Sequence, residues 1–278
     1  MNGPLSQPDT MGASFRLFTS RLYALNSCIV DTPDLVLVVD PGYLPDEIEG
    51  IRSYVDEMRQ GRPLYLLLTH SDSDHIAGYG AFADATVIAS QAFVEHPDRE
   101  AAVEEVKAID DDFYIDRPYP LIYPKVDHVI GNDGQQLTVG RTTLQFFQAV
   151  GHNRDGLAAW IEPGGLLMPG DYLSDLEFPF VTDSYEAYDE TLAKLSAILQ
   201  SNEGATLIPC HGSITADPAE IDRRIRLSET YLSLVADIAS GAQDSAAYGQ
   251  FVAAHGLRFP HFLRKQHEAN LALYRTQK

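Results

Sequence analysis

Residues 64–78 read Leu-Tyr-Leu-Leu-Leu-Thr-His-Ser-Asp-Ser-Asp-His-Ile-Ala-Gly. The apolar run at 64–68 predicts a buried strand, and the polar run after it places metal-binding side chains where that strand ends. Those side chains are His70, Asp72, Asp74 and His75. Imidazole and carboxylate groups are the ligands that borderline and hard divalent metals prefer. The stretch therefore predicts a metal-dependent enzyme.

Strands and helices alternate on both sides of this stretch. Residues 35–40 form a β-branched apolar run that ends in a turn at Asp40-Pro41-Gly42. Pro45 opens a helix whose apolar residues recur at helical spacing as far as Gly61. Residues 64–69 form the next strand. This strand–helix–strand order predicts an α/β domain.

The rest of the chain continues the pattern and then becomes helical. Strands are expected twice within 14–30 and at 85–89, 136–139, 143–150, 157–161, 166–168 and 206–210, and helices at 99–109 and 185–199. Residues 91–128 resemble an insertion. From Asp217 and Pro218, which form a good helix start, three helical pieces run to the end. We expect these helices to pack on the main domain or on a second subunit, which would make a homodimer.

Composition excludes several classes of protein. The chain has 278 residues with 40 acidic and 20 basic side chains, a net charge of −20, which argues against binding nucleic acid or anionic membranes. No apolar run is long enough to span a membrane. Residues 1–13 lack the features of a secretory signal and are expected to form a flexible arm. We therefore expect a cytoplasmic protein that acts on a small molecule, with Cys28 and Cys210 as small buried hydrophobic residues.

Three later segments each place a metal-binding side chain beside a glycine, just after a predicted strand. These segments contain Gly151-His152, Gly170-Asp171 and His211-Gly212. Glycine lets the backbone turn tightly and approach a metal centre closely. Strand ends at one edge of a layered α/β fold converge, so we expect these loops to meet residues 70–75.

In their order and spacing, these motifs resemble the metallo-β-lactamase superfamily over residues 14–215. The family signature is His-x-His-x-Asp-His, then a Gly-His, a Gly-Asp and a late Gly-His or similar segment. The Asp40-Pro41-Gly42 turn also matches the family's early Asp-x-Gly. The resemblance implies an α/β protein built as a four-layer αββα sandwich of two mixed β-sheets flanked by helices. Residues 14–215 would form that domain, with 91–128 inserted and 216–278 added as a helical extension.

The resemblance further implies two divalent metal ions, with a water or hydroxide between them as the nucleophile. The ligands would be His70, Asp72 and His152 at the first site, Asp74, His75 and His211 at the second, and Asp171 as the bridge.

Asp72 departs from the family pattern, because most members have histidine there. With Asp72, Asp74, Asp171 and one hydroxide, four negative charges face the four positive charges of two divalent ions. A less positive centre acidifies water less, and an added carboxylate favours harder metals. A carboxylate at this position occurs, as glutamate, in the di-iron branch of the family. Zinc is the expected metal, with iron and manganese as alternatives. Asp72 has one competing interpretation, a cap of its own turn.

The primary functional hypothesis is a hydrolase that cleaves an ester, lactone, thioester, amide or phosphoester. Asp74 would orient the hydroxide and move its proton. Tyr172 is a second catalytic candidate as a donor to a developing oxyanion, and its alternative interpretation is a packed core tyrosine. Asp40 is interpreted as a brace for the metal loops. The alternatives are a non-haem iron redox enzyme of the same superfamily and a non-catalytic metal-binding protein.

The remaining histidines are interpreted as surface or core residues. They are His96, His128, His255, His261 and His267.

Overall fold

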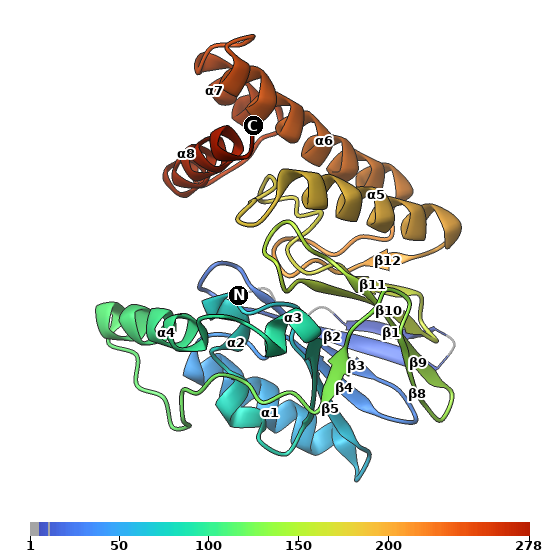
Figure 1. Ribbon diagram of the computed structural model, residues 1–278. Helices are drawn as coiled ribbons and strands as arrows, with labels where there is room; N and C mark the ends of the chain where they lie inside the picture. Colours follow the sequence, from blue (N-terminus) through green and yellow to red (C-terminus); the bar gives the residue numbers. More distant parts are fainter. Residues whose placement is uncertain (1–5, 11) are drawn as a thin grey trace.

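The computed structural model describes residues 6–10 and 12–278 as two β-sheets with helices on their outer faces (Figure 1). This confirms the predicted α/β sandwich. The larger sheet contains, in spatial order, β1 (Ser6–Thr10), β2 (Ala13–Thr19), β3 (Asn26–Asp31), β4 (Val36–Val39), β5 (Leu64–Leu67), β6 (Thr86–Ser90) and β7 (His128–Ile130). Neighbours from β1 to β4 are antiparallel, and those from β4 to β7 are parallel.

The smaller sheet is mostly antiparallel. Its spatial order is β12 (Thr206–Leu207), β11 (Leu166–Met168), β10 (Leu157–Glu162), β9 (Thr142–Gln148) and β8 (Gln136–Val139). Only the pair β11 and β12 is parallel.

Eight α-helices and one 3₁₀ helix complete the described chain. They are α1 (Pro45–Arg59), α2 (Ser73–Ile76), the 3₁₀ helix Tyr79–Phe82, α3 (Gln91–Val94), α4 (Arg99–Phe113), α5 (Tyr185–Ser201), α6 (Pro218–Ser240), α7 (Ala246–Ala254) and α8 (Pro260–Gln277). None of the helices within residues 6–10 and 12–278 is both long and apolar enough to cross a membrane.

The central strands, such as β3, β4, β10 and β11, bury both of their faces, because each sheet lies between a helical layer and the other sheet. Side chains alternate across a strand, so Leu67 of β5 enters the core between the sheets while Leu66 packs against α1. On the smaller sheet, Ala159 faces the inter-sheet core and Trp160 faces the helices. This arrangement explains why the parallel strands read as continuous apolar runs.

The C-terminal helices pack on the outer face of the smaller sheet and on one another. Leu195 of α5 and Ile225 of α6 share a core with Trp160 of β10. Asp217 caps α6 by accepting a hydrogen bond from the N–H of Ala219 at 3.0 Å. Figure 1 shows α6, α7 and α8 gathered beyond α5, on the side away from the larger sheet.

The expected N-terminal arm is partly ordered as a strand. Residues 6–10 form β1 and pair with β2, so this segment was wrongly predicted to be loose. Antiparallel pairing with β2 gives these residues backbone partners that composition does not reveal. Ala13 begins β2, and residues 1–5 and 11 of the predicted arm lie outside the described residues.

Candidate metal centre

Four strand ends bring the predicted ligands together at one edge of the sandwich. His70 follows β5, His152 follows β9, Asp171 follows β11 and His211 follows β12. Asp72 lies at the start of α2, and Asp74 and His75 lie within it. Two groups of side chains result, each compact enough to hold one ion: His70, His152 and Asp171, and Asp74, His75 and His211.

The first group converges on two aspartates. Oδ2 of Asp171 lies 3.7 Å from Nε2 of His70 and 3.4 Å from Nε2 of His152. Oδ2 of Asp72 lies 3.4 Å and 3.2 Å from the same two nitrogen atoms. Both aspartates therefore place a carboxylate oxygen beside the same two imidazole nitrogens, and His70, His152 and Asp171 form the mutually close set.

The second group shares Asp171 with the first. Oδ2 of Asp74 lies 3.5 Å from Nε2 of both His75 and His211. Asp171 approaches His75 through Oδ1 and His211 through Oδ2, each at 3.4 Å. Asp171 thus stands between the two groups, where a bridging ligand would be.

These distances fit a divalent ion. Two atoms that each lie about 2.1 Å from one ion are about 3.0 to 3.4 Å apart in octahedral or tetrahedral geometry. Nε2 of His70, Nε2 of His75 and Oδ1 of Asp171 are buried, and none has a hydrogen-bond partner. Buried polar atoms rarely lack partners, so these atoms point to a missing ligand. The donor set therefore fits two cations.

Each histidine is held by its other ring nitrogen. Nδ1 of His152 donates to the main-chain carbonyl of Phe180 at 2.7 Å, and Nδ1 of His211 donates to that of Tyr23 at 3.0 Å. Nδ1 of His70 lies 3.0 Å from the hydroxyl of Thr69. Such partners fix the tautomer and ring orientation of a metal ligand. The free nitrogen of each ring is consequently Nε2, which faces the centre.

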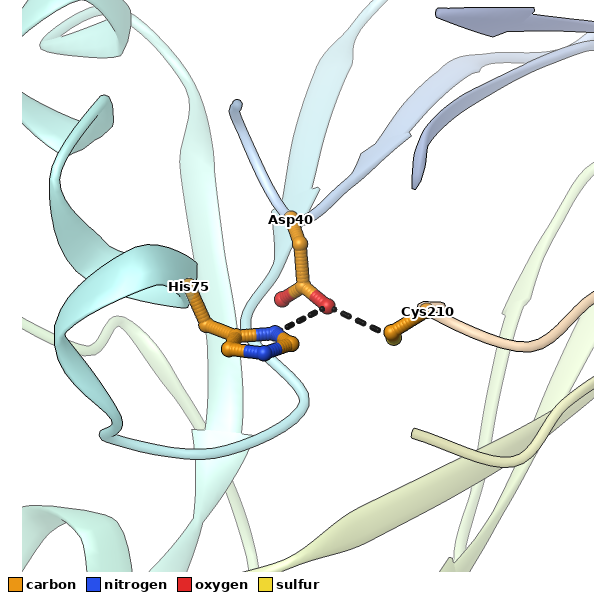
Figure 2. A group of neighbouring side chains, drawn as sticks. All are labelled: Asp40, His75 and Cys210. Carbon is orange, nitrogen blue, oxygen red and sulfur yellow. Dashed lines mark hydrogen bonds and ion pairs between the residues drawn. The ribbon is translucent and has the colours of Figure 1, made fainter. Parts of the chain in front are cut away.

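Asp40 holds His75 and joins it to two other segments (Figure 2). Its Oδ2 lies 2.9 Å from Nδ1 of His75 and accepts hydrogen bonds from Oγ1 of Thr69 at 2.8 Å and Sγ of Cys210 at 3.1 Å. Its Oδ1 accepts from the N–H of Thr69 at 2.9 Å. These contacts match the bracing role expected of Asp40.

Asp40, His75 and Cys210 also lie close enough to hold an ion by themselves. However, the contacts of Asp40 already use Nδ1 of His75 and the thiol of Cys210. Nε2 of His75 is the atom without a partner. We therefore assign His75 to the larger centre and Asp40 and Cys210 to its support.

The carboxylates of the centre raise the pKa of its outer histidines, so these rings hold protons where cations would bind. Burial alone would lower the pKa of both outer histidines, but the neighbouring carboxylates outweigh it. Asp72 and Asp171 raise the pKa of His152 to about 9, and Asp171 and Glu177 raise that of His211 to about 10. Burial would raise the pKa of Asp171, but the surrounding histidines hold it well below its usual range. The cluster is thus strongly selective for positive charge.

Asp72 is not a helix cap. It occupies the residue before α2, but its side chain makes no capping hydrogen bond. Its Oδ2 faces His70 and His152, and its Oδ1 accepts from the side-chain amide of Asn153 at 3.2 Å. The geometry therefore favours the ligand interpretation over the turn-cap alternative.

The contacts of Tyr172 favour the packed interpretation over the catalytic one. Its side chain is buried and stacks on Tyr188 with ring centroids 4.3 Å apart. Its hydroxyl donates to the carbonyl of Val150 at 2.7 Å and accepts from the N–H of His152 at 3.1 Å. The hydroxyl is therefore committed to the main chain of the loop that carries His152, and Tyr172 is a positioning residue.

The remaining histidines lie outside the two groups of ligands. His267 is buried among the C-terminal helices, with Nδ1 3.0 Å from the hydroxyl of Tyr231. His261 is exposed in the first turn of α8. Among residues 6–10 and 12–278, His96, His128 and His255 likewise belong to no potential metal-binding group.

Several supporting residues escaped the sequence reasoning. The side-chain amide of Asn26 donates to the carbonyls of Pro209 and Gly212, at 3.0 and 2.7 Å, and so anchors the loop of His211. Tyr23 and Phe180 act through main-chain carbonyls, which any residue type can supply. Among these supporting residues, only Thr69 could have been inferred from the sequence, because it directly precedes the candidate ligand His70.

The fold and the cluster together define an αββα protein with a candidate two-metal centre at the edge of its sheets. The chain belongs to the metallo-beta-lactamase superfamily, whose family model matches residues 22–212. Comparison with curated protein sequences gives no significant match.

Solved structures of known proteins share the fold at low identity. The B3 metallo-beta-lactamase BLEG-1 is 20% identical, with a TM-score of 0.55 over 72% of this chain and 93% of the other. An archaeal superfamily protein from Sulfolobus tokodaii is 16% identical, with a TM-score of 0.54 over 78% and 86%. The sec-alkyl sulfatase PisA1 is 14% identical, with a TM-score of 0.62 over 85% of this chain but 43% of the sulfatase. At these identities the likeness concerns the fold alone.

Proposed function

We propose that this protein is a hydrolase that holds two divalent metal ions and cleaves an ester, lactone, thioester, amide or phosphoester of a small molecule. One observation carries the proposal: four histidine Nε2 atoms and three aspartates form two groups that share Asp171, with buried ligand atoms left unpaired. Zinc is the expected metal, and manganese or iron are the alternatives.

Two divalent ions held here would supply Lewis acidity and would lower the pKa of water. The side chains and main-chain carbonyls of the protein would orient the water, accept its proton and hold the ligands in place. Asp72 and Asp74 are the ligands most open to solvent, with side chains 45% and 14% exposed. Asp74 would orient the attacking water and accept its proton. Phe180 and Tyr23, through their carbonyls, would keep His152 and His211 in place during the reaction.

The test is a panel of the five bond types offered to protein loaded with zinc, manganese or iron. We expect turnover of at least one class, and its loss by several orders of magnitude in Asp171→Asn and in His75→Ala. Asp112→Asn, an exposed change on α4, is the matched control and should keep full activity. A double variant of His75 and Asp171 that retains normal turnover would refute the assignment. Inactivity of the loaded protein on every class would favour a non-catalytic metal-binding protein.

A second candidate function rests on the contacts of Asp72. His70, His152 and Asp72 form a set of two histidines and one carboxylate, which suits ferrous iron. Iron-dependent redox chemistry on a thiol or persulfide would follow. Iron in the purified protein, together with oxygen consumption that requires a thiol, would establish this candidate over the hydrolase.

A further inference from the structure

An apolar pocket adjoins the second group of ligands. It has a volume of about 300 Å³ and is lined by Arg21, Tyr23, Ala24, Leu176, Glu177, Phe259 and Phe262. Two lining residues connect it to that group: the carbonyl of Tyr23 accepts from Nδ1 of His211, and Tyr23 and Glu177 both lie close enough to Asp74 to interact with its charge. A group in this pocket would therefore be attached close to the reacting bond.

Three of the residues that line the pocket are aromatic side chains that the rest of the molecule leaves exposed. Tyr23, Phe259 and Phe262 are 40%, 55% and 37% exposed, and they are three of the six large apolar side chains left exposed in the described part of the chain. Clustered exposed apolar side chains mark binding sites more often than scattered ones do.

Phe262 links the two halves of the centre. Its ring lies 6.4 Å from the ring of Tyr23 and 5.7 Å from the ring of Phe180, measured between centroids. The carbonyls of these two residues hold His211 and His152 respectively. The first turn of α8 therefore packs against the two residues whose carbonyls hold His211 and His152.

The charges of the pocket disfavour an anionic occupant. The guanidinium of Arg21 is already paired with Asp46 at 2.6 Å and with Glu47 at 2.9 Å. The remaining titratable side chains of the wall are Glu177 and Tyr23. Burial raises the pKa of Glu177 to about 7, so this carboxyl group is readily neutral. The lining residues therefore offer an occupant apolar contacts and no unpaired positive charge.

We propose that this pocket receives an uncharged alkyl or aryl group of the substrate, and that Phe262 and Phe259 set the preference for it. The inference rests on the proposed hydrolase function and narrows its substrate class. The volume is at the lower end of the range for ligand pockets, which favours a group of a few carbon atoms. A substrate with a carboxylate at the end of the same group should be rejected, because that charge would lose its water against an apolar wall that offers no free cation.

The test uses metal-loaded protein and, within the active bond class, substrates with acetyl, butanoyl, hexanoyl and adipoyl groups or the matching alkyl groups. We expect kcat/KM to rise roughly threefold per methylene up to hexanoyl and to fall about tenfold for the anionic adipoyl analogue. Phe262→Ala should reduce the hexanoyl-to-acetyl ratio about tenfold, and Phe262→Leu should restore part of it. Tyr114→Ala is the matched aromatic control, 95% exposed on the insertion, and should leave the ratio unchanged.

A binding measurement separates this inference from the hydrolase proposal. The neutral probe N-phenyl-1-naphthylamine should bind the chelator-treated protein saturably, about tenfold more weakly in Phe262→Ala and unchanged in Tyr114→Ala. Circular dichroism confirms that each variant is folded. Hydrolysis without chain-length preference, or probe binding indifferent to Phe262, overturns the inference while leaving the hydrolase proposal intact. Phe262-dependent probe binding without hydrolysis of any substrate supports the pocket and contradicts the hydrolase.

Discussion

At the scale of single residues, Asp40 determines whether His75 can act as a ligand. Its carboxylate is fully buried, and Thr69, His75 and Cys210 all approach it. Replacing Asp40 with Asn keeps the shape but leaves one of these donors without an acceptor. We expect Asp40→Asn to weaken binding of the second metal ion by about 10- to 100-fold. The free energy of unfolding should fall by about 1–3 kcal/mol.

Competition with a chromophoric chelator measures this loss, and Asp112→Asn serves as the isosteric control on an exposed helix. An Asp40→Asn variant that binds two ions as tightly as the parent protein would remove Asp40 from the account of the site.

The outer histidines predict how stability depends on pH. In the folded, metal-free protein the pKa of His152 is about 9 and that of His211 about 10, whereas an unfolded chain has about 6.5. Because the folded pKa is raised, this contribution to stability is full below pH 6.5 and is lost as the pH rises through 9 to 10. The urea midpoint of chelator-treated protein should therefore fall between pH 7 and pH 10.

The slope of that decline should be smaller in His211→Gln, which lacks one of the titrating groups. His261→Gln, a change at an exposed histidine, should keep the full slope. A midpoint that rises with pH over this range in the chelated parent protein would show that the carboxylates do not hold protons on these rings.

At the scale of elements, the loop after β9 depends on the absence of a side chain at Gly151. This residue has a φ of +118°, and a Cβ atom there would overlap the main-chain nitrogen and Cα of Tyr188 at the start of α5. Gly151→Ala therefore forces the loop away from the helix and shifts His152. We expect a loss of at least about 2 kcal/mol in the free energy of unfolding and weaker metal binding.

Gly249 provides the control within the same chain. It lies inside α7 with open space around it, so Gly249→Ala should stabilise the protein by about 0.5–1 kcal/mol. Thermal unfolding measures both variants. Equal effects of the two substitutions would show that the close packing of Gly151 on α5 contributes nothing.

The sequence predicted the strands, the helices and the candidate ligands better than it predicted the residues that support those ligands. The apolar runs and helical spacings located β5, α1 and α5 nearly to the residue, because their burial patterns follow the period of the backbone. The seven candidate ligands could be named from the sequence because they lie in short motifs after predicted strands, and the structure brings them together. Their supports were not found, since the carbonyls of Tyr23 and Phe180 carry no sequence signal. The two interpretations of Tyr172 could not be separated from the sequence, because its neighbour Asp171 faces the centre while the hydroxyl of Tyr172 bonds the main chain of the His152 loop.

At the scale of the whole molecule, Asn270 couples the C-terminal helices to the metal centre. Its side chain accepts from the N–H of Val181 at 3.0 Å and donates to the carbonyl of Pro179 at 2.7 Å and the hydroxyl of Tyr231 at 2.9 Å. The segment it fixes includes Phe180, whose carbonyl holds His152. The docking of α8 therefore supports the first metal group from a distance.

Asn270→Ala leaves these buried partners unsatisfied. We expect a loss of about 1–3 kcal/mol and a drop in melting temperature of about 2–4 °C for each kcal/mol, together with weaker metal binding. Glu268→Ala, an exposed change on the same helix, is the control. If Asn270→Ala lowers the melting temperature while metal affinity stays at the parent value, the helices stabilise the fold without supporting the site.

The number and positions of the bound ions show whether the seven candidate side chains hold two metal ions. Anomalous difference maps from crystals of the metal-loaded protein would locate them. We expect two peaks, with Asp171 touching both. One peak should contact His70, Asp72 and His152, and the other should contact Asp74, His75 and His211. The absence of any peak among these side chains, or a single peak at Asp40, His75 and Cys210, would contradict this expectation.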